Sequence, residues 1–155
     1  RDSPGDVAMA TVLLDHQVAM ALILDGRLLS GVTRRTGDIA HIVAGTPGPV
    51  CDECGHMCLQ QQLLALRTDP ATATLLDAAH ALAAVLAPIA AGVELTEVVL
   101  SGFPDAVADE LAGLTHRSLR TRMLDEHVPA VRVSKRGPSA AMIGAAALML
   151  YRLLG

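Results

Sequence analysis

Three cysteines and a histidine stand close together in the segment HIVAGTPGPVCDECGHMC, which runs from His41 to Cys58. These are all the cysteines of the chain, and they lie within eight residues. Cys51 and Cys54 have the Cys-x-x-Cys spacing that lets two thiolates reach one ion, and Gly55 eases the turn that follows. Three cysteines cannot all pair within one chain. Metal binding in a reducing compartment therefore fits them better than a disulfide framework.

Zinc is the metal that this set of donors predicts. Structural zinc sites take four nitrogen or sulfur ligands in a tetrahedron, commonly three cysteines and one histidine. The fourth ligand could be His41 or His56. His56 lies inside the loop, but nearness in sequence does not fix the direction of its side chain. His41 would come from the end of a strand and would attach the loop to the sheet. Four candidate ligands indicate a closed structural site, because catalytic zinc keeps a position for water. Three unliganded, buried thiols are the alternative. We expect a zinc loop over residues 43–58 whose ligands are His41, Cys51, Cys54 and Cys58.

The elements that must position this loop predict an α/β fold. Apolar segments before the loop are typical of strands, and Asp25-Gly26 is a strong signal for a hairpin turn. After the loop the apolar period becomes helical, with two short strands between helices. Hairpins followed by helical crossovers predict a mixed sheet like that of ribonuclease H. The expected strands are 7–14, 17–24, 27–32, 37–44 (or the end of a strand), 96–102 and 129–135, and the expected helices are 57–67, 69–95, 104–123 and 139–154.

Two of these helices carry more detailed expectations. In the helix at 69–95, Asp69 can cap the start and Pro70 suits the first turn, while Pro88 predicts a kink or a break. The helix at 104–123 is amphipathic, with apolar residues at Val107, Leu111, Leu114 and Leu119.

Composition and charge exclude several classes of protein. Hydrophobic residues make up 52% of the 155 residues, but the chain has one Phe, one Tyr and no Trp, which argues against the aromatic platforms that bind single-stranded nucleic acid. The net charge of −4 argues against a phosphate-binding surface over the whole domain. The apolar run at 140–151 is shorter than the ~20 residues of a membrane span. We expect a cytoplasmic protein without a membrane partner, and a homodimer formed by the apolar helices at 75–87 and 140–154, with core burial as the alternative.

Several features occur along the chain in this order: LILDGRLLSG, GDIAHIV, nine residues between His41 and Cys51, the cysteine cluster, EVVLSG and GPSAAMIGAAALML. This series resembles the ROK family (repressor, open reading frame, kinase), whose members are sugar kinases and sugar-responsive transcriptional repressors. The resemblance implies that residues 1–155 form a single C-terminal lobe of an actin-like, ribonuclease-H-like fold, and residues 1–6 could belong to a preceding segment. It also implies that DNA would be bound only through an N-terminal helix-turn-helix outside this chain.

The resemblance assigns a sugar site as well, with departures. The family's Glu-x-x-His would fall on Asp38 and His41, and the Glu that follows its last cysteine would fall on Gln60. Asp38 is one methylene shorter than Glu, and Gln60 has lost the charge. The middle cysteine, Cys54, stands one place later than in the family. A sugar effector would therefore bind at Asp38, His41 and Gln60 in a way that differs from the family's usual substrates.

The kinase motifs of the family are degraded. Its Gly-Thr-Gly-x-Gly turn falls on LDHQVAMA (14–21), which has no glycine, and its later Gly pair is reduced to Ser101-Gly102, followed by the bulky Phe103. Asp2 stands in a setting only loosely similar to the family's catalytic Asn-Asp-x-Asn, with neither Asn present. We therefore expect no catalytic residues and no enzyme activity. The prediction is a non-catalytic effector-sensing and dimerisation domain of a ROK-type transcriptional regulator. The alternatives are part of an ATP-dependent sugar kinase or a structural zinc module without a ligand.

Overall fold

The computed structural model describes residues 7–33, 35–45 and 47–134. Its strands are β1 (Met9–Leu14), β2 (Val18–Leu24), β3 (Arg27–Leu28), β4 (Glu97–Ser101) and β5 (Ala130–Val133). Its helices are α1 (Leu59–Leu64), α2 (Thr72–Val93) and α3 (Asp105–Arg120), with short 3-10 turns at Ala65–Arg67 and Asp125–His127. The predicted closing helix at 139–154, residues 1–6 and Asp2 lie outside the described residues.

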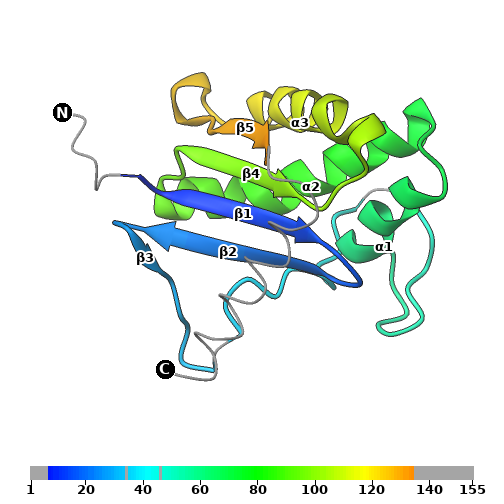
Figure 1. The fold of residues 1–155 in the computed structure, drawn as a ribbon, viewed down its shortest axis with the longest axis horizontal. Coiled ribbons are helices and arrows are strands. Elements are labelled where there is room, and N and C mark those ends of the chain that lie inside the picture. The colour runs from blue at the N-terminus through cyan, green and yellow to red at the C-terminus, as the bar shows by residue number, and fades with distance from the viewer. Residues whose placement is uncertain (1–6, 34, 46, 135–155) are drawn as a thin grey trace.

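The five strands form one mixed sheet in the order β3-β2-β1-β4-β5. β1, β2 and β3 pair antiparallel, whereas β4 pairs parallel with β1 and β5 pairs parallel with β4. The two parallel connections contain α2 and α3, which lie on one face of the sheet (Figure 1). Helical crossovers between parallel strands follow the expected pattern. The predicted α/β class and mixed sheet are therefore confirmed.

The hairpin between β2 and β3 is built on the predicted Asp25-Gly26 turn. Both residues have positive φ, 51° and 73°, as a two-residue turn that matches strand twist requires. The returning strand is shorter than the predicted 27–32, because only Arg27 and Leu28 pair with β2.

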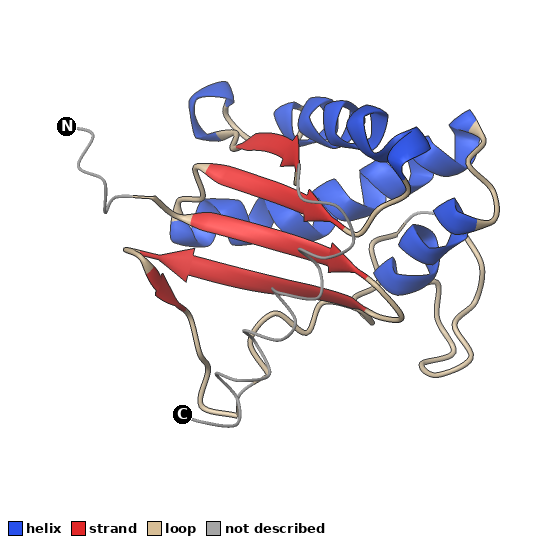
Figure 2. Cartoon of the chain, viewed as in Figure 1, coloured by secondary structure: helices blue, strands red, loops and turns tan. Residues whose placement is uncertain are grey.

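The core lies between the helices and one face of the sheet (Figure 2). Side chains alternate along a strand, so every second residue of β1 and β2 faces the helices. The register places Val12 opposite Met20 and Leu100, and all three are buried. Other fully buried side chains include Leu14, Leu63, Leu75, Leu82, Leu86, Leu111 and Leu119.

Helix α2 runs without a break from Thr72 through Pro88 to Val93, so the predicted break does not occur. A proline inside a helix leaves the carbonyl four residues earlier without its partner. Pro88 is exposed and Ala84 is partly exposed, so solvent can reach that carbonyl. At the start of α2, Asp69 accepts hydrogen bonds from the Ala71 N–H at 3.1 Å and the Thr74 hydroxyl at 2.7 Å, although the N-cap position itself is Ala71.

The apolar side chains of α2 are used inside the lobe. Within the described part of the chain, α2 is long and apolar enough by length and composition to cross a membrane, but half of its most apolar stretch is buried. Ten of its residues, among them Leu75, Leu82 and Leu86, are buried, and the helix packs on α3 and α1. Core burial therefore accounts for the buried residues of 75–87, whereas Leu76 and His80 of the same stretch are exposed.

The predicted strand at 37–44 is wrong. These residues form turns, and their sole β-type pairing in the described chain is a bridge between Val43 and Cys58. Gly37 has φ of 87°, and a Cβ added there would overlap the carbonyl oxygen of Met20. The close approach lets the Met20 N–H donate to the Gly37 carbonyl at 2.9 Å. The segment is therefore fastened to the edge of β2 at one point and does not extend the sheet.

Candidate metal centre

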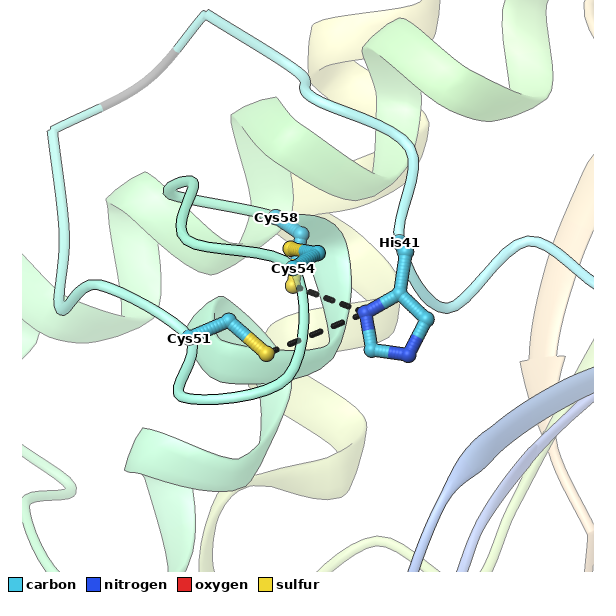
Figure 3. A group of neighbouring side chains, drawn as sticks. All are labelled: His41, Cys51, Cys54 and Cys58. Carbon is cyan, nitrogen blue, oxygen red and sulfur yellow. Dashed lines mark hydrogen bonds between the residues drawn. The ribbon is translucent and has the colours of Figure 1, made fainter.

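The four predicted zinc ligands come together in the structure. The ligand atoms of His41, Cys51, Cys54 and Cys58 all lie within 4.8 Å of one another (Figure 3). The Nδ1 atom of His41 is 3.8 Å from Sγ of Cys51 and 3.7 Å from Sγ of Cys58. Zinc bonds to nitrogen and sulfur in a tetrahedron imply an N···S separation of about 3.6 Å. The donor set and its spacing therefore fit a zinc ion held by these four side chains.

The backbone of residues 51–58 folds into a tight turn that gathers the sulfurs. The Gly55 N–H donates to the Cys51 carbonyl at 2.8 Å, and Gly55 has the positive φ of 71° that this turn requires. The N–H groups of Cys51 and Cys58 both donate to the His56 carbonyl, at 2.9 and 3.0 Å. His56 therefore organises the loop through its backbone, while its exposed side chain stays outside the metal-binding group.

His41 reaches the cysteines from a separate segment that is tied to the start of α1. The Leu59 N–H donates to the Ile42 carbonyl at 2.9 Å, and the Gln60 N–H donates to the Ala40 carbonyl at 2.8 Å. These two bonds flank His41 and hold it beside Cys58, the residue that precedes α1. The prediction that His41 stands at the end of a strand is wrong, because it stands in a turn. The choice of His41 over His56 agrees with the geometry.

The surroundings of two thiols act on their pKa values in opposite directions. The backbone N–H of Cys54, helped by that of Glu53, stabilises the Cys51 thiolate and lowers its pKa to about 6. Burial raises the pKa of the Cys58 thiol, because removal from water disfavours the charged form. The loop backbone therefore favours the thiolate form of Cys51, which is the form that binds a metal, whereas burial opposes it at Cys58.

Glu53 is a site residue that the sequence reasoning missed. Its Oε2 atom lies 3.1 Å from Nε2 of His41, on the ring nitrogen that does not face the sulfurs. A carboxylate is a common partner for a metal-binding histidine, but Asp52 and Glu53 both lie between Cys51 and Cys54, so the sequence alone does not select Glu53.

The residues that the resemblance assigned to a sugar differ in their exposure and in their partners. Asp38 is exposed, whereas Gln60 is 3% exposed. The Gln60 Oε1 atom accepts a hydrogen bond from the Val18 N–H at 3.3 Å, at the start of β2. Gln60 therefore has a structural partner inside the lobe, and His41 is shared with the cysteine cluster.

The β1–β2 turn, where the resemblance would put the phosphate-binding glycines, is short and exposed, and backbone groups at its start already have partners. Its Asp15 N–H donates to the Gln17 carbonyl at 3.1 Å. The Leu14 carbonyl accepts from Arg67 Nη2 at 3.4 Å, and a Cβ added at Gly102 would overlap that same carbonyl oxygen. Phe103 is 7% exposed and belongs to the core, so its bulk is turned inward.

Comparison with known proteins gives matches among solved structures only. No family model matches the sequence, and no curated protein matches it. A ROK hexokinase from Thermus thermophilus is similar at 20% identity and a TM-score of 0.64, over 92% of this chain and 57% of that one. A ROK family transcriptional regulator, a homolog of the E. coli MLC protein, is similar at 16% identity and a TM-score of 0.69, over 91% of this chain and 45% of that one. The chain has the ROK fold. A ROK family glucokinase from Streptomyces griseus, in complex with glucose and AMPPNP, is similar at 18% identity and a TM-score of 0.60, over 93% of this chain and 61% of that one.

These matches confirm that the chain shares the fold of ROK proteins over about nine-tenths of its length, as the sequence resemblance implied. The chain spans about half the length of the proteins it matches. Because kinases and a regulator share this fold, the choice between their functions depends on the site residues.

Proposed function

We propose that this chain is a non-catalytic effector-sensing and dimerisation lobe of a ROK-type, sugar-responsive transcriptional regulator. In this proposal the lobe is cytoplasmic, forms a homodimer and is stabilised by zinc. DNA is bound by an N-terminal domain outside the chain. The observation that carries the proposal is the β1–β2 turn, where a kinase of this fold would hold phosphates.

Residues 15–17 of that turn do not suit a phosphate. Phosphate-binding turns use glycines, so that several backbone N–H groups can approach the anion. Here Asp15, His16 and Gln17 carry side chains, and the Asp15 carboxylate would repel a phosphate. The Asp15 N–H already has a backbone acceptor, and Gly102 and Arg67 already contact the adjacent Leu14 carbonyl. Phosphoryl transfer depends on positioning and charge stabilisation, and this turn supports neither.

Zinc at His41, Cys51, Cys54 and Cys58 has a structural role in the proposal. Most residues between 47 and 57 are exposed, so the loop has little apolar core of its own. Four protein ligands close the coordination sphere, and a bound zinc supplies cross-linking of the loop to the segment that carries His41. Metal binding thereby replaces the packing that the loop lacks.

A sugar effector would use Asp38, His41 and Gln60, as the family resemblance implies. Two of these groups already have partners, because Glu53 lies at His41 Nε2 and the Val18 N–H lies at Gln60. A sugar hydroxyl that reaches His41 must displace Glu53. We therefore expect a weaker or more selective interaction than a site with free donors and acceptors would give.

The experiment uses the full-length protein with both lobes, offered hexoses, amino sugars and sugar phosphates with and without ATP. The proposal predicts no ATP-dependent sugar turnover, together with a sugar-dependent rise in melting temperature and a change in DNA affinity. Turnover above an Asp2→Ala control would establish the kinase function instead. A protein that responds to no sugar would be the structural zinc module.

A further inference from the structure

We propose that Glu53 is a positioning residue for the metal centre, which holds the His41 ring so that Nδ1 is the metal-binding nitrogen. The proposal rests on the zinc site proposed above and adds a residue to it. Glu53 comes from the same short loop as the cysteines, between Cys51 and Cys54, yet it acts on the ligand that comes from outside the loop.

The two nitrogens of the His41 ring face different partners. Nδ1 lies 3.8 Å from the sulfur of Cys51 and 3.7 Å from that of Cys58 (Figure 3). Nε2 lies 3.1 Å from the Glu53 carboxylate. The ring is therefore held from both sides, and its two contacts distinguish its nitrogens.

The chemistry of imidazole decides which of the two ring nitrogens can bind the metal in this arrangement. Neutral histidine carries one N–H and one lone pair, and the hydrogen bond made by one nitrogen decides which nitrogen is free to bind a metal. A carboxylate can only accept, so the ring must donate its proton from Nε2 to Glu53. That leaves the lone pair on Nδ1, toward the sulfurs. A carboxylate partner also makes the imidazole a more basic ligand.

The competing explanation is an exposed surface pair with no effect on the metal. The His41 side chain is 36% exposed and that of Glu53 is 62% exposed. Exposed pairs of this kind contribute little to stability, because water screens them. Zinc affinity separates the two explanations, because loss of an outer partner of a metal-binding histidine typically costs ~10–100-fold in affinity, and this exposure favours the lower end.

The test measures the zinc dissociation constant of the whole chain by chelator competition, with Glu53→Ala, Glu53→Gln and Asp52→Asn. Asp52 is the matched control, because it is a neighbouring exposed carboxylate, whereas the ion pair with His41 is made by Glu53. We expect Glu53→Ala to weaken zinc binding about tenfold. Glu53→Gln should keep most of the wild-type zinc affinity, because its amide oxygen can still accept from His41. Asp52→Asn should leave the zinc affinity unchanged.

A second readout follows the His41 ring directly. In the zinc-loaded protein, NMR should show that the Nε2–H proton is protected from solvent exchange, and this protection should be lost in Glu53→Ala and in Glu53→Lys and kept in Asp52→Asn. Wild-type zinc affinity in Glu53→Ala together with an unchanged Nε2–H signal would overturn the proposal while leaving the zinc site standing. A wild-type chain that binds no zinc would overturn the site itself.

Discussion

The backbone N–H of Met20 donates to the carbonyl of Gly37 at 2.9 Å, and this bond fastens the segment that carries His41 to the edge of the sheet. β3 pairs with β2 at Ile23 and Leu24, and the Leu29 N–H donates to the Leu22 carbonyl at 2.8 Å, so the bond at Met20 lies beyond this pairing. The position requires glycine for two reasons, a φ of 87° and direct contact with the Met20 carbonyl oxygen. The sheet therefore helps to place the metal site through a single glycine.

Gly37→Ala should lower the free energy of unfolding by at least ~2 kcal/mol, because strain at positive φ adds to a backbone overlap. Gly26→Ala is the matched control. Gly26 has a similar φ of 73° but has no other group within 4 Å of its missing Cβ, so its cost should stay near ~1 kcal/mol. Urea denaturation of the zinc-loaded variants measures the difference. Equal losses would show that the contact with Met20 is not restrictive.

Gln60→Ala should destabilise the fold, because it leaves the Val18 N–H without its acceptor at the buried start of β2. A buried donor without a partner costs about 1–3 kcal/mol. Gln60→Glu keeps an acceptor but places a carboxylate where the side chain is 3% exposed, so we expect it to lower the melting temperature as well unless a ligand is bound. Thermal melts with and without hexose measure both variants. A melting temperature unaffected by Gln60→Ala would contradict the structural role.

The Asp69 carboxylate should stabilise the fold at neutral pH and lose this contribution in acid. The Thr74 hydroxyl, followed by the Ala71 N–H, stabilises its carboxylate and holds its pKa below the ordinary value of about 3.9. A lowered pKa in the folded state stabilises the fold above the unfolded pKa, and this contribution is lost as pH falls through the folded value. Asp69→Asn should therefore lower the melting temperature at pH 6, and its effect should shrink as pH falls below the ordinary aspartate pKa of about 3.9. Thr74→Val should reproduce part of the change, and a variant effect that does not vary with pH would contradict this assignment.

The sheet and its hairpin were predictable because local signals and global fold agree there. Asp25-Gly26 needs positive φ at both positions, and few other residue pairs accept it so readily. The prediction of a strand at 37–44 is wrong because alternation of polar and apolar residues also occurs in turns, and here Gly37 packs directly against the Met20 carbonyl. Pro88 did not break α2, because it lies on the solvent-facing side, where the freed carbonyl can be hydrated.

The candidate site was predictable in its ligands and less so in their surroundings. Cysteine spacing indicates a metal site directly, since few other functions need three thiols within eight residues. The role of Glu53 depends on where the His41 ring turns, which no spacing rule supplies. The partner of Gln60 is Val18, 42 positions away, and the packing of α1 against β2 brings them together only in the fold.

Zinc content tests the central claim most directly. Chelator-free protein, measured by elemental analysis, should contain about one zinc per chain, as expected for one four-ligand site. His41→Ala should lower this content and the melting temperature, whereas His56→Ala should leave both unchanged, because His56 contributes its backbone carbonyl and not its side chain. A protein that contains no zinc, and whose melting temperature does not change when zinc is added or removed, would contradict the account.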